Sequence, residues 1–173
     1  YGIDNLSHAY DVRMKEYRLA KLRELPGFQF QKIDIVPKEN INLIKEFAPN
    51  IDAVINLAAV AGVRSSLSDP WGYVETNTIG ALNMLEYCRQ QGISKIVMAS
   101  TSSLYGNLGK PPHDETASTD YPLAPYAASK KGAEALCYAY HHLYQMDVTI
   151  LRYFTVYGPA GRPDMVMFRF CQW

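Results

Sequence analysis

The stretch ISKIVMASTSSLYG, residues 93–106, carries the strongest sign of the fold. Its first half, Ile93–Ala99, has the length of a strand and ends in the continuous apolar run Ile96–Ala99, and its second half is rich in hydroxyl groups. A continuous apolar strand is typical of a parallel sheet that is covered on both faces. The stretch therefore predicts a buried parallel strand that ends in a polar loop.

Strands and helices alternate on both sides of this stretch. Apolar and alternating patterns predict strands, and turn-spaced apolar residues predict helices. We expect strands at Tyr1–Ile3, Phe28–Ile35, Ala53–Leu57, Ile93–Ala99 and Val148–Tyr153, and helices near 10–24, 38–47, 70–91 and 124–145, with a loop at 107–122 and a new element near Asp164. This order predicts an α/β fold, a doubly wound parallel sheet of the Rossmann-like kind.

Composition excludes several classes of protein. The chain has 173 residues, of which 48% are hydrophobic and 20% charged, and its formal net charge is zero, so neither nucleic acid nor a membrane is an expected partner. No segment approaches the ~20 apolar residues of a membrane span. Cys88, Cys137 and Cys171 lack the spacing of a metal site, and we expect no metal. An odd number of cysteines without a disulfide framework indicates packed thiols in a reducing compartment, and we expect a cytoplasmic protein.

Tyr126 and Lys130 stand four residues apart in PYAASKK, residues 125–131. One helical turn would bring the phenol and the ammonium group to the same face. A neighbouring cation favours the phenolate, which is a usable base for the oxidation of an alcohol. The pair alone also fits an ordinary solvated helix, and the hydroxyl-rich segment after Ala99 strengthens the catalytic interpretation.

The sequence contains no G-x-G-x-x-G turn, although a doubly wound sheet normally opens with a strand, such a turn and a helix. The chain also starts without methionine, in a predicted strand. We therefore expect an internal fragment, with a partial dinucleotide-binding domain at 1–157 and the start of a substrate domain at 158–173. Asp4 fits an acid at the end of a second strand that bonds a ribose hydroxyl. A plain turn at Asp4-Asn5 is the alternative.

Seven short motifs taken in order carry a family resemblance. They are GIDNL (2–6), NLAA (56–59), AGVR (61–64), ASTSSLYG (99–106), YAASK (126–130), RYFTVYGP (152–159) and GRPDM (161–165). Together they resemble the extended short-chain dehydrogenase/reductase family, and within it the NAD-dependent nucleotide-sugar epimerases and dehydratases. The last two motifs resemble most the branch that acts on uronates.

The resemblance implies a function and a cofactor. It implies an NAD-dependent epimerisation of a nucleotide sugar at C4, most closely of UDP-glucuronate to UDP-galacturonate, through a 4-keto intermediate. Tyr126 would be the catalytic base, Lys130 its activator, and Thr101 the hydroxyl that bonds the reacting sugar oxygen. An acid at Asp4 favours NAD over NADP. The implied cofactor-binding residues are Asp4, Asn5, Asp34, Ile35, Leu57, Ala58, Ala59, Asn77, Ser100, Tyr126, Lys130, Tyr153 and Phe154.

The resemblance also implies a substrate site, formed by Arg64, Thr101, Ser102, Ser103, Thr155 and Arg162. The hydroxyl groups would grip the sugar carboxylate, and Arg162 would pair with a carboxylate or a diphosphate. A 4-keto uronic acid loses carbon dioxide readily, so this grip would protect the intermediate.

Other interpretations stay open at this point. Decarboxylases of UDP-glucuronate often carry a glutamate where Ser103 stands, and sugar 4,6-dehydratases usually carry an acidic pair after the threonine, where Ser102 and Ser103 stand. The chain could also be an inactive fragment or a binding module. The resemblance further implies a homodimer through the helices near 70–91 and 124–145, the second of which carries Tyr138, Tyr140 and Tyr144.

Overall fold

The computed structural model describes residues 1–107 and 112–172. It divides into two compact units. The first consists of Tyr1–Asp34 with the described part of Thr155–Trp173, and the second of Ile35–Phe154. This division follows contacts within the chain, and the domain boundary expected at 157 stays a prediction.

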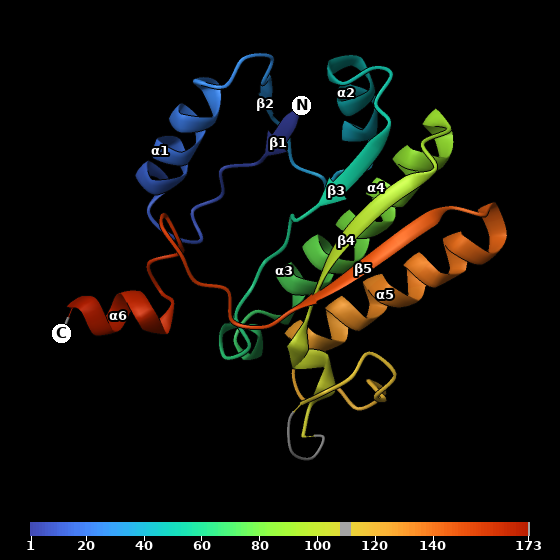
Figure 1. Ribbon diagram of the computed structural model, residues 1–173. Helices are drawn as coiled ribbons and strands as arrows, with labels where there is room; N and C mark the ends of the chain where they lie inside the picture. Colours follow the sequence, from blue (N-terminus) through green and yellow to red (C-terminus); the bar gives the residue numbers. More distant parts are fainter. Residues whose placement is uncertain (108–111, 173) are drawn as a thin grey trace. The chain divides into compact units, whose positions relative to one another are not determined.

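The first unit is built on a pair of short parallel strands. β1 (Gly2–Asp4) pairs with β2 (Phe30–Lys32), and α1 (Val12–Arg23) connects them (Figure 1). The unit ends in α6 (Val166–Gln172), which is the element expected near Asp164. The predicted strand at Phe28–Ile35 is thus shortened to three residues, because β1 offers only three residues for pairing.

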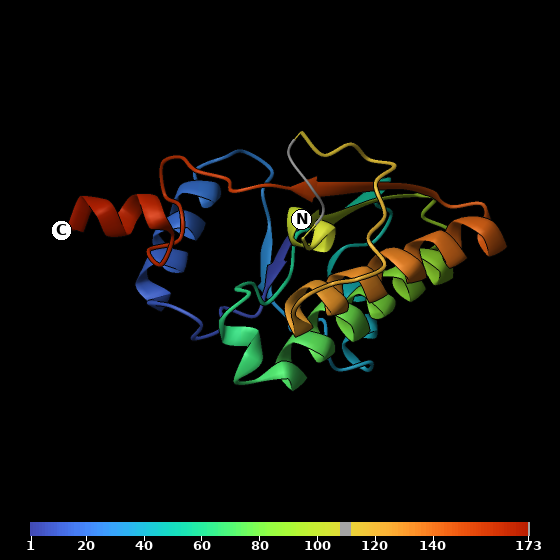
Figure 2. The same ribbon diagram turned by 90° about the horizontal axis from the view of Figure 1, so that it is seen from below.

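The second unit is a three-stranded parallel sheet with the order β3-β4-β5. Its strands are β3 (Ala53–Asn56), β4 (Lys95–Thr101) and β5 (Asp147–Tyr153), and α2 (Asn40–Phe47) precedes β3. Figure 2 shows α4 (Gly80–Gln91) and α5 (Pro125–Tyr144) running together along one side of β4 and β5. The parallel, Rossmann-like fold class is confirmed.

The helix expected at 70–91 is one helical run with an interruption. α3 (Pro70–Val74) is followed by a π-helical turn, Glu75–Ile79, and then by α4 (Gly80–Gln91). Asp69 caps the start by accepting a hydrogen bond from the Gly72 amide, and Gly92 ends the run in the left-handed conformation that glycine adopts at little cost. No local sequence pattern predicts the π-helical turn, a kind of turn that is often found at functional sites.

The core of the second unit lies between the sheet and α4 and α5 (Pro125–Tyr144). Leu85, Ile96 and Met98 are almost completely buried there. Cys88 and Cys137 pack in the same way, and burial raises the pKa of both thiols to about 12. The prediction of packed thiols holds for these two, whereas Cys171 of the first unit is exposed.

None of the helices in the described ranges is both long enough and apolar enough to cross a membrane.

Candidate active site

The hydroxyl-rich segment lies where β4 ends. Thr101 is the last residue of β4, is buried, and caps η3 (Ser102–Tyr105), a short 3-10 helix. Its Oγ1 accepts a hydrogen bond from the Ser103 amide at 3.1 Å and donates one to Ser103 Oγ at 3.2 Å. The carboxyl ends of parallel strands are where such folds bind ligands, so the predicted reactive hydroxyl stands at the expected edge.

Lys130 on α5 reaches the same strand. Its side chain is buried, and Nζ donates a hydrogen bond to the carbonyl of Ala99 at 2.8 Å, two residues before Thr101. Burial lowers the pKa of the ammonium group to about 8, while the neighbouring Cys137 thiol and Glu134 carboxylate act in the opposite direction. A single carbonyl uses one of three donors, so Nζ has hydrogen-bonding capacity left for a ligand.

Tyr126 lies one turn before Lys130 on α5 and is half-buried. Its ring meets that of Tyr73 edge to face, with centres 6.0 Å apart. Tyr73 is buried on α3 and donates from its hydroxyl to the carbonyl of Ala61 at 3.4 Å. Sequence reasoning missed Tyr73, because no local spacing relates it to Tyr126. Its ring packs against that of Tyr126.

Asn77 in the π-helical turn is buried and forms hydrogen bonds with two other segments of the chain. Its amide accepts from the Val60 amide at 2.9 Å, donates to the Val60 carbonyl at 3.0 Å and donates to Ser129 Oγ at 3.0 Å. Ser129 in turn donates to the carbonyl of Tyr126 at 2.8 Å. Asn77 stays a predicted cofactor contact, and the observed bonds fix the loop after β3 against the start of α5.

Three predicted cofactor residues follow β3 directly. Leu57, Ala58 and Ala59 are exposed, and the Ala58 amide donates to Asn56 Oδ1 at 3.1 Å. These three side chains therefore do not belong to the core of this unit. Of the other predicted contacts, Ile35 and Ser100 are buried, while Tyr153 and Phe154 are exposed at the end of β5.

The first unit holds three of the predicted cofactor contacts, Asp4, Asn5 and Asp34. Asn5 Nδ2 donates to Asp34 Oδ2 at 2.9 Å, so these two side chains meet although they are 29 residues apart. Asp4 at the end of β1 is exposed, and its Oδ1 accepts from the Leu6 amide at 2.6 Å. The remaining oxygen of Asp4 is suited to accept from a sugar hydroxyl.

The predicted substrate residues fall into both units. Thr155 and Arg162 belong to the first unit, and Arg162 forms two hydrogen bonds to Asp164, at 3.0 and 2.8 Å. Arg64 belongs to the second unit and is exposed just before the short helix η1 (Ser65–Leu67). The structure describes each unit by itself, so a common pocket for Arg162 and Thr101 stays a prediction.

Comparisons with known proteins agree with this geometry. Residues 2–172 match the family model described as "NAD dependent epimerase/dehydratase family". Over 172 residues the chain is 54% identical to a UDP-glucuronate 4-epimerase of Thermodesulfobacterium geofontis, covering 99% of this chain and 53% of the relative. A probable UDP-glucuronate 4-epimerase of Rhizobium meliloti is 41% identical, and the match covers 98% of this chain and 49% of the relative.

Solved structures give the same result. The UDP-glucuronic acid 4-epimerase of Bacillus cereus, in complex with UDP-glucuronic acid and NAD, is similar with a TM-score of 0.85 and 36% identity, covering 97% of this chain and 52% of that one. A dTDP-glucose 4,6-dehydratase of Streptomyces venezuelae has a TM-score of 0.87 at 28% identity, and the match covers 98% of this chain and 50% of that one. The chain spans about half the length of the relatives it matches. It belongs to the NAD dependent epimerase/dehydratase family.

Proposed function

We propose that the full-length protein epimerises UDP-glucuronate at C4 to UDP-galacturonate with NAD as cofactor. The observation that carries this proposal is the bond from Lys130 Nζ to the Ala99 carbonyl, which holds the helix of Tyr126 against the strand that ends at Thr101. The 54% identity to a UDP-glucuronate 4-epimerase supports the choice of substrate.

The residues present fit NAD. Exposed small residues follow β3, where a cofactor could pass close to the sheet, and the buried ammonium of Lys130 has donors to spare for a ribose hydroxyl. The exposed carboxylate of Asp4 would bond the other ribose, and its charge would repel a 2′-phosphate. When bound, NAD supplies the hydride chemistry by oxidising and then reducing the sugar at C4.

The protein's own residues handle the proton. Tyr126, as the phenolate, would remove the proton of the 4-hydroxyl group and later return it to the same oxygen, once C4 has been reduced from its opposite face. Lys130 stabilises the phenolate because its positive charge lies one turn away. The Thr101 hydroxyl can donate to the 4-keto oxygen or accept from the 4-hydroxyl, so it serves both oxidation states.

The sugar carboxylate is the feature that we expect the substrate site to recognise. Ser102, Ser103 and Thr155 would hold it near the plane of the ring, and Arg162 would exchange its bond with Asp164 for the carboxylate or the diphosphate. This hold would slow the loss of carbon dioxide from the 4-keto uronate. Dehydration is disfavoured because Ser102 and Ser103 offer no carboxylate.

Exposed aromatic side chains favour a homodimer of the full-length protein. Tyr138 and Tyr144 of α5 and Trp71 of α3 are large apolar side chains that are 72%, 48% and 77% exposed, and such a surface is suited to a second copy. Tyr140 lies inward, where its hydroxyl donates to Glu86 at 2.6 Å.

The unpaired cysteines favour the cytoplasm as the compartment of this protein, because disulfides are rare where thiols are kept reduced.

The test is to incubate the full-length protein with NAD and UDP-glucuronate and to separate the nucleotide sugars. We expect UDP-galacturonate, and adding UDP-galacturonate alone should yield UDP-glucuronate. UDP-xylose with stoichiometric carbon dioxide would identify a decarboxylase instead. No turnover of either uronate by a protein that binds NAD would overturn the proposal.

A further inference from the structure

A salt bridge joins Arg152 to Glu134 in the second unit, and neither residue has a part in the reaction proposed above. Arg152 is the penultimate residue of β5, and Glu134 lies one turn beyond Lys130 on α5. Arg152 Nε donates to Glu134 Oε1 at 3.0 Å and Nη2 to Oε2 at 2.9 Å. The two side chains are 21% and 8% exposed, so the pair is well shielded from water.

The same guanidinium group reaches two further segments. Its Nη1 donates to the hydroxyl of Tyr105 at 3.4 Å and to the carbonyl of Glu115 at 3.2 Å, and its carbon lies 5.3 Å from the centre of the Tyr105 ring. Tyr105 ends η3, which begins directly after Thr101. Arg152 therefore connects α5, the segment after β4 and the loop before α5 with one rigid, planar group.

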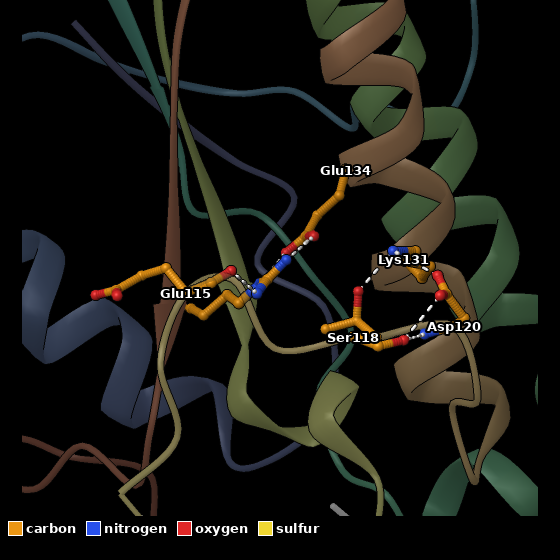
Figure 3. A network of polar contacts seen from close by, with 7 residues as sticks. Glu115, Ser118, Asp120, Lys131 and Glu134 are labelled. Atoms are coloured by element: carbon orange, nitrogen blue, oxygen red, sulfur yellow. Dashed lines mark hydrogen bonds and ion pairs between the residues drawn. The ribbon is translucent and has the colours of Figure 1, made fainter.

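A second contact holds the same loop to α5. Lys131 Nζ donates to Thr119 Oγ1 at 2.5 Å and forms an ion pair with Asp120 at 3.6 Å. Figure 3 shows Glu134 and Lys131 projecting from the same helix, with Glu115, Ser118 and Asp120 on the loop beside them. The described part of the loop is thus held at two places, by Arg152 of β5 and by Lys131 of α5.

The charges of the pair are maintained despite burial. Burial acts to raise the pKa of the Glu134 carboxyl, but the hydrogen bonds from Arg152, the nearby Ser100 hydroxyl and the charges of Arg152 and Lys131 outweigh it, so that this pKa lies below its ordinary value. Ser100 Oγ makes this contribution from nearby without a well-formed hydrogen bond. A buried ion pair is weak evidence for stability, because desolvation offsets much of the attraction. Because the same guanidinium group contacts three segments, the pair is suited instead to orienting those segments.

We propose that Arg152 is a positioning residue for the C4 chemistry. Through Glu134 it fixes α5, the helix of Tyr126 and Lys130, and through Tyr105 it fixes the segment that starts at Thr101. The inference rests on the proposed function, because the groups so aligned are the base and the reactive hydroxyl. A misplacement of about 1 Å between such groups can cost about 10²-fold in rate.

The test compares Arg152→Lys with Arg13→Lys in the full-length protein. Arg13 is the matched control, because it also forms a two-bond pair with a carboxylate, that of Asp11, but its side chain is 87% exposed. Lysine keeps the charge of Arg152 and cannot contact Glu134, Tyr105 and Glu115 at once. For Arg152→Lys we expect kcat to fall about 10²-fold while KM and the Kd for NAD change less than about 2-fold. Arg13→Lys should match the unsubstituted protein.

Hydrogen–deuterium exchange gives a readout that does not depend on activity. In Arg152→Lys the amides of 102–105 and 113–119 should exchange about tenfold faster, while those in the middle of α5 keep their protection. Tyr105→Phe, which removes only one hydroxyl group, should show a smaller change at the same amides and a smaller loss of kcat.

The outcomes separate the two proposals. Unchanged exchange at 102–105 in both variants would overturn the positioning role. So would an equal loss of protection throughout β4 and α5, because that result indicates a general structural role. If the unsubstituted protein turns over no uronate, the proposed function fails, and the exchange comparison still decides whether Arg152 holds these segments together.

Discussion

Lys130 and Ala99 are joined by a hydrogen bond of 2.8 Å between a buried ammonium group and a backbone carbonyl. Ala99 precedes Thr101 by two residues on β4, and Lys130 follows Tyr126 by one turn of α5. The bond therefore ties the helix of the proposed base to the strand of the proposed reactive hydroxyl. It also explains why a lysine is buried at this position, since the carbonyl replaces part of its lost hydration.

Tyr126→Phe should remove the proposed base and leave the fold intact. Because general acid–base catalysis contributes about 10²- to 10⁴-fold, we expect kcat for uronate epimerisation to fall by about 10³-fold, with little change in the Kd for NAD. Steady-state kinetics and calorimetry measure the two quantities. Tyr17→Phe, at an exposed position on α1, is the control and should be fully active. A Tyr126→Phe protein with more than about a tenth of the normal rate would contradict the role.

The burial of Lys130 should make stability depend on pH. Its pKa in the folded protein is about 8 and its ordinary value is 10.5, so between these values the unfolded chain binds more protons than the folded one. Stability from this group therefore rises as the pH increases from 8 to 10.5, and its burial cost is fully present below pH 8.

Lys130→Met isolates this effect. The free energy of unfolding of the unsubstituted protein relative to Lys130→Met should increase by up to ~3 kcal/mol across that pH window, as urea titrations at several pH values would show. Lys45→Met removes an exposed lysine from α2 and serves as the control. Parallel stability curves for the Lys130→Met and unsubstituted proteins would show that Lys130 keeps its ordinary pKa.

Asn77→Ala should destabilise the second unit. The substitution removes three hydrogen bonds and leaves polar groups of the half-buried Val60 and the buried Ser129 without these partners. We expect a loss of ~2–3 kcal/mol in the free energy of unfolding, measured by chemical denaturation. Asn42→Ala, at an exposed site on α2, should stay within ~0.5 kcal/mol. Equal effects of the two substitutions would contradict the bracing role of Asn77.

Ser102→Ala and Thr155→Ala test the grip on the sugar carboxylate. If these hydroxyl groups hold the carboxylate in the plane of the ring, each substitution should raise the ratio of carbon dioxide released to epimer formed. Carbon dioxide from a carboxyl-labelled substrate and chromatography of the nucleotide sugars give this ratio. Ser94→Ala, just before the amino-terminal end of β4, should leave the ratio unchanged, and the idea fails if all three variants behave alike.

Local patterns predicted most of the elements because their signals lie within the elements themselves. The predicted strand after Gly92 is β4 in the structure. Asp69 and Pro70 begin a helix, as expected of a capping residue that is followed by proline. The extent of β2 could not be predicted, because a strand is only as long as the strand it pairs with. The turn at Glu75–Ile79 has no local signature either.

The candidate site was predicted where one motif holds several of its members. Thr101 and the Tyr126–Lys130 pair follow from neighbouring residues and from the family resemblance. Contacts that join distant positions were missed, such as Tyr73 with Tyr126 and Arg152 with Glu134. These pairs depend on how helices pack on the sheet, so no spacing in the sequence reports them.

The most direct measurement follows deuterium placed at C4 of UDP-glucuronate during conversion by the full-length protein in ordinary water. Oxidation and reduction at C4 within one closed site predict UDP-galacturonate that keeps the deuterium at C4, and Tyr126→Phe should form almost none of this product. Product that has exchanged its C4 deuterium for solvent hydrogen, or product in which C4 is not inverted, would contradict the account.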